Sequence, residues 1–253
     1  MFKLYFLIYL LAHILGDYYF QSEVLASQKK ERIRKLIRHC IFYLAAFLVV
    51  ILPVFTYEML ISVLIISLTH AAIDILKYCY MKYWKKHPNS IYAERKMYLI
   101  DQAVHLLTLA IAAYIMARNG YQFNLVPVAE EFYRITGFEL LGNISWIVLV
   151  LIIYKPANIT IKRMLSMYKP EDKIEEKNGD NDNKAGGFIG FLERIIILFF
   201  LLIGQYAAIG LVLTAKSVAR YDKISKDKKF AEYYLLGTLL STVIVIAAYS
   251  IIL

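Results

Sequence analysis

The sequence predicts an all-α fold, a polytopic bundle of about eight transmembrane helices. Hydrophobic residues make up 60% of the 253 residues and mean hydropathy is +0.54, whereas soluble domains average roughly 45–50% apolar residues. The apolar residues fall in blocks of roughly the 20 residues that a helix needs to cross a bilayer. Apolar and polar residues do not alternate within these blocks, as barrel strands would require. Because hydrocarbon leaves no backbone amide unpaired, the blocks are predicted to be helices.

Eight spans are expected, at residues 2–21, 37–57, 59–80, 95–117, 139–161, 188–204, 205–221 and 230–252. The first block lacks a basic stretch beyond Lys3 and a small-residue cleavage site, so it is interpreted as a retained span rather than a signal peptide. The sixth and seventh spans are short, since residues 188–221 make about 51 Å of helix at 1.5 Å per residue. A break is expected at Gly204–Gln205, and a re-entrant pair is the alternative.

Basic residues alternate from loop to loop. The first, third, fifth and seventh loops are rich in Lys and Arg; the third, for example, holds Lys82, Lys85, Lys86, Arg95 and Lys96. The second loop, near Pro53–Glu58, has no Lys or Arg. Residues 118–138 have two arginines, which two glutamates balance. The positive-inside rule then places the odd loops in the cytoplasm and both termini outside. The net charge of +9 is explained by this pattern, and the chain has no module typical of nucleic-acid binding.

The segment 169–187, KPEDKIEEKNGDNDNKAGG, differs from the rest in composition. Its polar residues of mixed charge cannot bury enough apolar surface to order themselves. We therefore expect a flexible cytoplasmic linker here. It would separate a five-span module, residues 1–168, from a three-span module, residues 188–253.

Ionisable residues inside spans are costly and mark candidate functional sites. Three His–Asp pairs occur at i,i+4 spacing, which puts both side chains of a pair on one helix face; they are His13 with Asp17, His70 with Asp74, and Asp101 with His105. The predicted topology puts all three pairs, and His39, in the cytoplasmic halves of their helices. The outer halves carry almost no charge. A single polar site near the cytoplasmic face is the prediction.

Imidazole and carboxylate groups together favour a divalent metal such as Zn²⁺ or Mn²⁺. The three pairs offer six ligands, enough for two ions, and two adjacent ions can hydrolyse phosphate or amide bonds. His39 would be a reserve ligand or a general base. Cationic residues of the last three spans, Arg194, Lys216 and Arg220, are candidates to hold an anionic group such as a lipid phosphate.

Simpler interpretations stand beside this one. Each His–Asp pair could satisfy itself by a hydrogen bond inside a helix bundle. Lys216 and Arg220 could extend to the headgroups, as long basic side chains near helix ends do. Glu193 and Arg194 could form a structural ion pair.

Several motifs resemble a bacterial membrane family known as domain of unknown function 3307. They are LLAHILGDYYFQ at the start, LTHAAIDILK, LIDQAVHLL, GFLERIIILF, and LTAKSVARY with EYYLLGTLLS. The resemblance covers nearly the whole chain and implies a protein of the bacterial inner membrane, but no established activity. The paired His and Asp residues are also distantly similar to membrane-bound metal-dependent hydrolases.

Three functions remain open at this point. The first is a metal-dependent hydrolase acting on a lipid or lipid-linked substrate from the cytoplasmic leaflet. The second is an ion-coupled transporter, because His and Asp chains in spans also relay protons. The third is a non-enzymatic partner or assembly protein whose basic loops bind anionic lipids or a cytoplasmic protein. Membrane lipids are partners in every case, and the sequence leaves the oligomeric state open.

Overall fold

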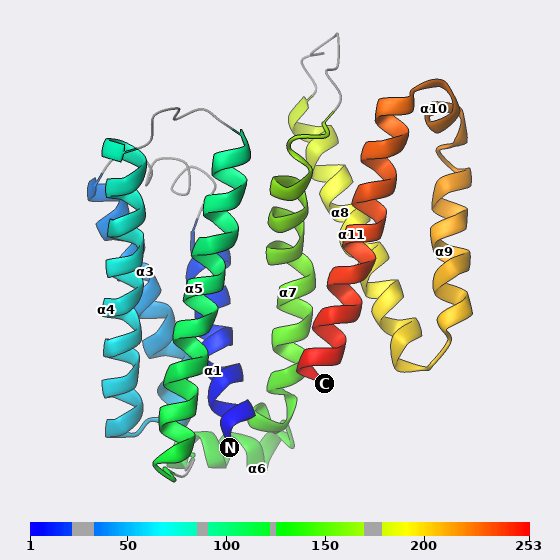
Figure 1. The fold of residues 1–253 in the computed structure, drawn as a ribbon. Helices are drawn as coiled ribbons and strands as arrows, with labels where there is room; N and C mark the ends of the chain where they lie inside the picture. The colour runs from blue at the N-terminus through cyan, green and yellow to red at the C-terminus, as the bar shows by residue number, and fades with distance from the viewer. Residues whose placement is uncertain (22–32, 85–90, 122–124, 170–178) are drawn as a thin grey trace. The chain divides into compact units, whose positions relative to one another are not determined.

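A computed structural model describes residues 1–21, 33–84, 91–121, 125–169 and 179–253. These residues form helices and no strand (Figure 1), which confirms the predicted all-α class. The chain divides into two compact units, Met1–Val148 and Leu149–Leu253. Each unit is described by itself.

Unit 1 is built on four long helical segments. They are α1 (Phe2–Ile14) with the π-helical turn η1 (Leu15–Tyr19), α3 (Ile33–Ile51) with η2 (Leu52–Val54), α4 (Tyr57–Cys79) with the π-helical turn η3 (Tyr80–Trp84), and α5 (Ile91–Arg118). Helix α1 packs on α3 and α5, and α4 packs on the same two helices. The four segments therefore enclose one core. Pro53 lies at the end of α3, and the Thr56 side chain caps α4 by accepting from the Met59 amide at 3.2 Å.

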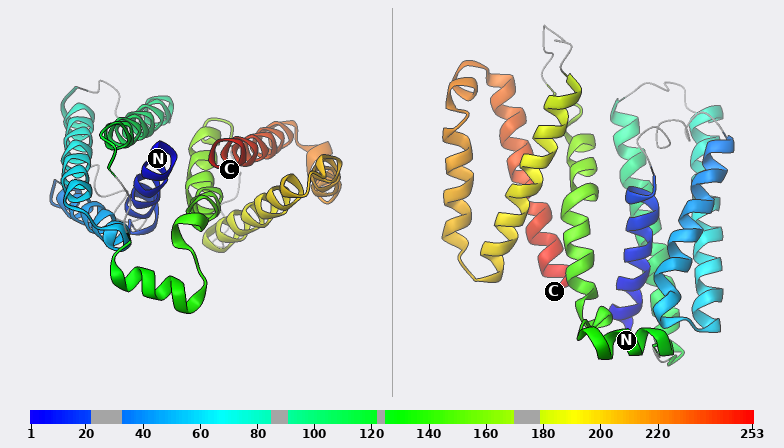
Figure 2. Two further views of the ribbon diagram at one scale, coloured as in Figure 1. Left: turned by 90° about the horizontal axis from the view of Figure 1, so that it is seen from below. Right: turned by 180° about the vertical axis from the view of Figure 1, so that it is seen from behind.

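A short helix, α6 (Pro127–Thr136), follows α5 and lies crosswise at the ends of the long helices of unit 1 (Figure 2). The sequence predicted only a loop over residues 118–138. Pro127 stands at the first turn of α6, and Gly137 ends it with φ +67°. The proline and the glycine are sequence signals that could have predicted this helix. With 10 residues it is too short to cross the membrane.

Unit 2 contains most of α7 (Leu140–Leu165), then α8 (Gly179–Leu202), α9 (Tyr206–Val218), α10 (Tyr221–Lys226) and α11 (Lys228–Ile252). Helix α8 packs on α11 and α9. The break expected at Gly204–Gln205 is present, because Gly204 adopts φ +68° between α8 and α9. Helix α8 begins inside the segment expected as a linker, so residues 179–187 are helical; residues 170–178 lie outside the described part of the chain.

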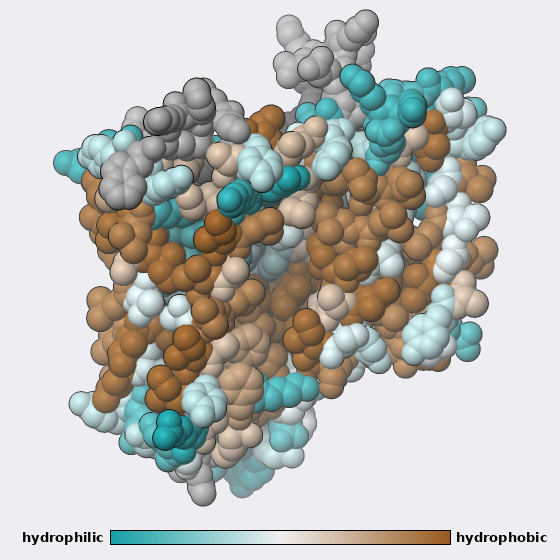
Figure 3. All heavy atoms as spheres, viewed as in Figure 1, coloured by the Kyte–Doolittle hydropathy of each residue, from teal (hydrophilic) through white to brown (hydrophobic). Residues whose placement is uncertain are grey.

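The chain is a membrane protein by the length and composition of its helices. Among the described residues, five helical segments are long and apolar enough to cross a bilayer: Ile33–Val54, Tyr57–Tyr83, Ile91–Arg118, Leu141–Leu165 and Lys228–Ile252. Hydrophobic residues cover the sides of the helices, and hydrophilic ones gather near their ends (Figure 3). Helix α9 is apolar but about 20 Å long, shorter than the roughly 30 Å of a hydrocarbon core.

Candidate metal centre

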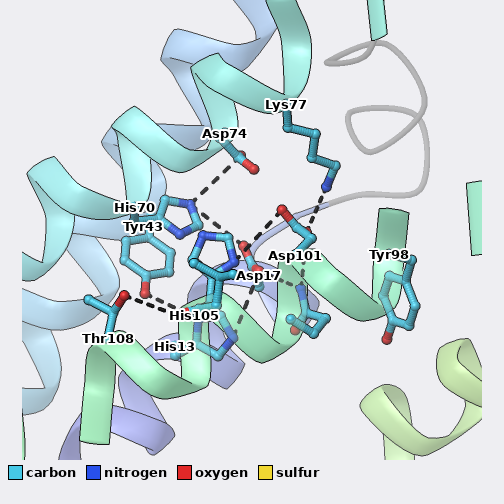
Figure 4. A network of polar contacts seen from close by, with 12 residues as sticks. His13, Asp17, Tyr43, His70, Asp74, Lys77, Tyr98, Asp101, His105 and Thr108 are labelled. Atoms are coloured by element: carbon cyan, nitrogen blue, oxygen red, sulfur yellow. Dashed lines mark hydrogen bonds and ion pairs between the residues drawn. The ribbon is translucent and has the colours of Figure 1, made fainter. Parts of the chain in front are cut away.

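The four long segments of unit 1 bring seven His and Asp side chains to one buried cluster. Figure 4 shows His13, Asp17, His70, Asp74, Asp101 and His105 pointing toward one another. Each of the seven is at most 7% exposed. They comprise the three predicted pairs and the histidine predicted as a reserve ligand: His13 and Asp17 from α1 and η1, His39 from α3, His70 and Asp74 from α4, and Asp101 and His105 from α5. We call this set the His/Asp cluster. The structure therefore brings together the residues that the sequence singled out, and their roles stay a prediction.

Asp17 reaches the cluster from a π-helical turn. In η1 the Phe20 amide donates to the Leu15 carbonyl at 2.8 Å, five residues back. Such turns widen the helix locally and occur frequently at functional sites. The preceding residue, Gly16, allows close approach to α3: a Cβ there would lie 2.8 Å from Tyr43 Cδ2 and 3.2 Å from Tyr43 Cα. No sequence pattern that we recognised indicated this turn.

His39 lies at the centre of the closest contacts. Its Nε2 is 3.1 Å from Asp17 Oδ1, 3.2 Å from His70 Nε2 and 3.5 Å from Asp74 Oδ2. By contrast, the two partners within each predicted i,i+4 pair are 3.8–3.9 Å apart. The short contacts thus cross from helix to helix, and the expected reserve ligand makes more of them than any other histidine.

A polar network continues from the cluster along α5. Asp101 Oδ2 accepts from Lys77 Nζ at 2.6 Å. The Gln102 amide nitrogen lies 3.4 Å from both Asp17 Oδ2 and Asp101 Oδ2, and Tyr18 donates to Gln102 Oε1 at 2.8 Å. The sequence analysis did not single out Gln102, although its side-chain amide contacts two carboxylates of the cluster.

Aromatic packing fixes the imidazole rings. The Tyr43 ring stacks flat on His70 with centroids 3.6 Å apart and planes at 6°. The Tyr43 hydroxyl lies 3.1 Å from His13 Nδ1, and the rings of His70 and His105 are 4.4 Å apart. Tyr43 was also overlooked, because it is one of 21 tyrosines, although it follows His39 at the same i,i+4 spacing as the His–Asp pairs.

The donor atoms form three sets that could each hold an ion, with ligand atoms within 4.8 Å of one another. The sets are His13–Asp17–His70, His39–His70–Asp74 and Asp74–Asp101–His105. Several buried donor atoms in them have no hydrogen-bond partner among the described residues: His70 Nδ1, Asp101 Oδ1 and both ring nitrogens of His105. Buried polar atoms are normally paired, so the arrangement fits a bound cation.

The cationic residues predicted from the last three spans lie in unit 2. Arg194 is 2% exposed; its Nε donates to the Ile153 carbonyl at 2.5 Å and its Nη1 to Ser241 at 3.5 Å. Lys216 forms an ion pair with Glu193 at 2.6 Å. The alternative of a Glu193–Arg194 ion pair was therefore wrong.

Arg220 is exposed and lies at the start of α10. The contacts of Arg194 and Lys216 given above are all made within unit 2. Their expected role in anion binding stays a prediction.

The comparison with known families agrees with the resemblance noted from the motifs before residue 131, and the later motifs lie outside the match. No curated protein and no solved structure matches the chain, so the distant similarity to metal-dependent hydrolases has no support from these comparisons. One family model matches residues 5–131, a stretch that includes the whole His/Asp cluster. The chain therefore belongs to the family described as "Protein of unknown function (DUF3307)".

Proposed function

We propose that the His/Asp cluster binds two divalent metal ions and that the protein is a metal-dependent hydrolase of a lipid or lipid-linked substrate. The observation that carries this proposal is the position of Asp74, which belongs to two of the three ligand sets. A carboxylate has two oxygens and can bridge two ions. The sets His39–His70–Asp74 and Asp74–Asp101–His105 share only that residue, so both can be filled at once.

The distances argue against the alternative that each His–Asp pair only forms a hydrogen bond within itself. A hydrogen bond from an imidazole to a carboxylate is about 2.7–3.2 Å long, whereas the three i,i+4 pairs are separated by 3.8–3.9 Å. His39 and His70 also place two Nε2 atoms 3.2 Å apart beside two carboxylates. Nitrogen lone pairs that converge in this way suit a shared cation, and imidazole with carboxylate is a usual ligand combination for Zn²⁺ and Mn²⁺.

The chemistry follows from the ligand set. Two adjacent ions, when bound, lower the pKa of a water molecule and polarise the bond to be cleaved. The chain's own residues hold the carboxylates in place: Lys77 and Gln102 bind Asp101, and Gln102 also contacts Asp17. Tyr43 keeps the His70 ring oriented by stacking on it.

The substrate class follows from the depth of the cluster. His70 is 13 residues beyond the start of α4, about 20 Å along the helix, so a molecule hydrolysed there must enter the bilayer region. Basic residues at the same end of α4 and α5, such as Lys82 and Arg95, support a cytoplasmic position of this end by the positive-inside rule. We therefore propose access from the cytoplasmic leaflet, with both termini outside, in a bacterial inner membrane.

The test is hydrolysis by the purified protein in nanodiscs made from extracted bacterial lipids. We expect cleavage of a lipid or lipid-linked compound that requires added Zn²⁺ or Mn²⁺ and is lost in Asp74→Asn. Bound metal without hydrolysis, together with metal or proton flux into proteoliposomes, would assign a transporter instead. Hydrolysis that is unchanged in Asp74→Asn and in the chelated protein would refute the proposal.

A further inference from the structure

An apolar pocket lies at the end of unit 1 opposite the His/Asp cluster. It has a volume of about 680 Å³ and is formed by the end of α3, by α6 and by the start of α7. Apolar residues including Leu52, Val126, Ala129 and Phe132 line it, and Glu139 is the charged residue at its wall. Ligand pockets in proteins usually enclose about 300–1,000 Å³, so the pocket has room for an elongated apolar molecule.

Helix α6, which forms one wall, is amphipathic and uncovered. Its apolar residues Val128, Phe132 and Ile135 recur at i, i+4 and i+7, and they are 79%, 55% and 72% exposed. Glu130 lies on the opposite face, and Glu131 and Arg134 lie beside the apolar face and form an ion pair at 3.3 Å. No residue of α6 is buried. An apolar helix face of this kind, lying crosswise at the ends of membrane helices (Figure 1), is typical of a helix in the membrane interface.

The pocket is held open by the backbone. The Val126 amide donates to the Pro53 carbonyl at 2.9 Å, which ties the start of α6 to the end of α3. Pro127 and Gly137 fix the two ends of the helix. Because these contacts do not depend on an occupant, the wall stays in place when the pocket is empty.

We propose that α6 lies in the membrane interface and that this pocket holds an acyl chain of a bilayer lipid with an amine headgroup. The bilayer supplies acyl chains at high local concentration beside an apolar opening. The charged residues of α6 and the residue before α7, Glu130, Glu131 and Glu139 against Arg134, give the wall of the pocket an acidic excess, which repels an anionic headgroup and favours a cationic amine. The site is separate from the metal centre and does not depend on its function.

The experiment fills the pocket and counts bound lipid. Ala129→Trp places an indole in the pocket, whereas Ile135→Trp adds the same ring to the same helix outside the lining. We expect native mass spectrometry of the detergent-solubilised protein to show one retained phosphatidylethanolamine in the unchanged chain and in Ile135→Trp, and none in Ala129→Trp. Metal content should be the same in all three. Retention in Ala129→Trp, absence from the unchanged chain, or a preference for phosphatidylglycerol would overturn the proposal.

A second measurement tests the position of α6 without filling the pocket. Spin labels are attached at Ile135→Cys and Glu130→Cys, neither of which lines the pocket, after Cys40 and Cys79 are changed to Ser. The label at 135 should be relaxed mainly by oxygen, which concentrates in lipid, and the label at 130 mainly by a water-soluble nickel chelate. Equal exposure of both labels to the chelate would contradict an interfacial helix.

Discussion

Gly16→Ala tests how closely α1 and α3 must approach for the cluster to form. The new methyl group would lie 2.8 Å from Tyr43 Cδ2 and 3.2 Å from Tyr43 Cα. A ring can rotate, but the contact with Cα is a backbone contact, so the two helices must separate by a few tenths of an ångström. Overpacking of this kind costs about 1–3 kcal/mol, while replacing a helical glycine regains about 1 kcal/mol. The net loss is therefore roughly 0–2 kcal/mol.

The effect on the metal centre should exceed the effect on stability. Tyr43 stacks on His70 and contacts His13, so its displacement moves two candidate ligands. Loss of such supporting contacts usually weakens metal binding about 10–100-fold. The melting temperature should fall by about 2–4 °C for each kcal/mol lost.

The assay is thermal unfolding in detergent with and without Zn²⁺, combined with equilibrium dialysis of the metal. Gly210→Ala is the matched control, because a Cβ at Gly210 in α9 meets nothing within 4 Å; we expect it to leave metal affinity unchanged and stability equal or higher. If Gly16→Ala also leaves both quantities unchanged, the close helix contact does not position the cluster and the reasoning fails.

Two further substitutions test unit 1 and unit 2 separately. Lys77→Met removes the cation bound to Asp101 and should destabilise the protein by less than the roughly 3–5 kcal/mol of a fully buried ion pair, because Lys77 is 23% exposed. Added Zn²⁺ should recover most of this loss of stability in thermal melts. An equal loss with and without metal would show that Asp101 is not a ligand. Arg194→Met removes charged hydrogen bonds to Ile153 and Ser241, each worth about 1.5–3 kcal/mol, so the melting temperature should fall while metal content is retained; loss of metal would link Arg194 to the cluster.

The positions of the long helices could be predicted because each helix is marked by a local feature of the sequence, a block of apolar residues. A block of apolar residues must form a helix in a bilayer, so helices lie at all the segments expected as spans. Helix α6 was missed because its 10 residues are far fewer than the roughly 20 of a span, although its apolar residues recur at i, i+4 and i+7. The linker was predicted too long, since residues 179–187 continue the apolar helix that follows them.

The members of the cluster could be predicted, but their contacts could not. An i,i+4 pair shows which residues share a helix face, and loop charges show at which depth they lie. The rotation of each helix about its axis depends on packing, which a single sequence does not reveal. This explains why His39, which lacks an acidic residue four positions away, was ranked below His13 although it lies closer to Asp17. The π-helical turn that carries Asp17 into the cluster likewise could not be predicted from the local sequence.

The central claim is that the His/Asp cluster is a metal centre, and the metal content of the purified protein tests it most directly. The protein is dialysed against Zn²⁺ or Mn²⁺ and its bound metal is measured by mass spectrometry, in parallel with Asp74→Asn. Because Asp74 belongs to both of the ligand sets proposed to hold an ion, we expect up to two ions per chain in the unchanged protein and a loss of both in the variant. A protein that binds no metal after loading, or a variant that binds as much as the unchanged chain, would contradict the account.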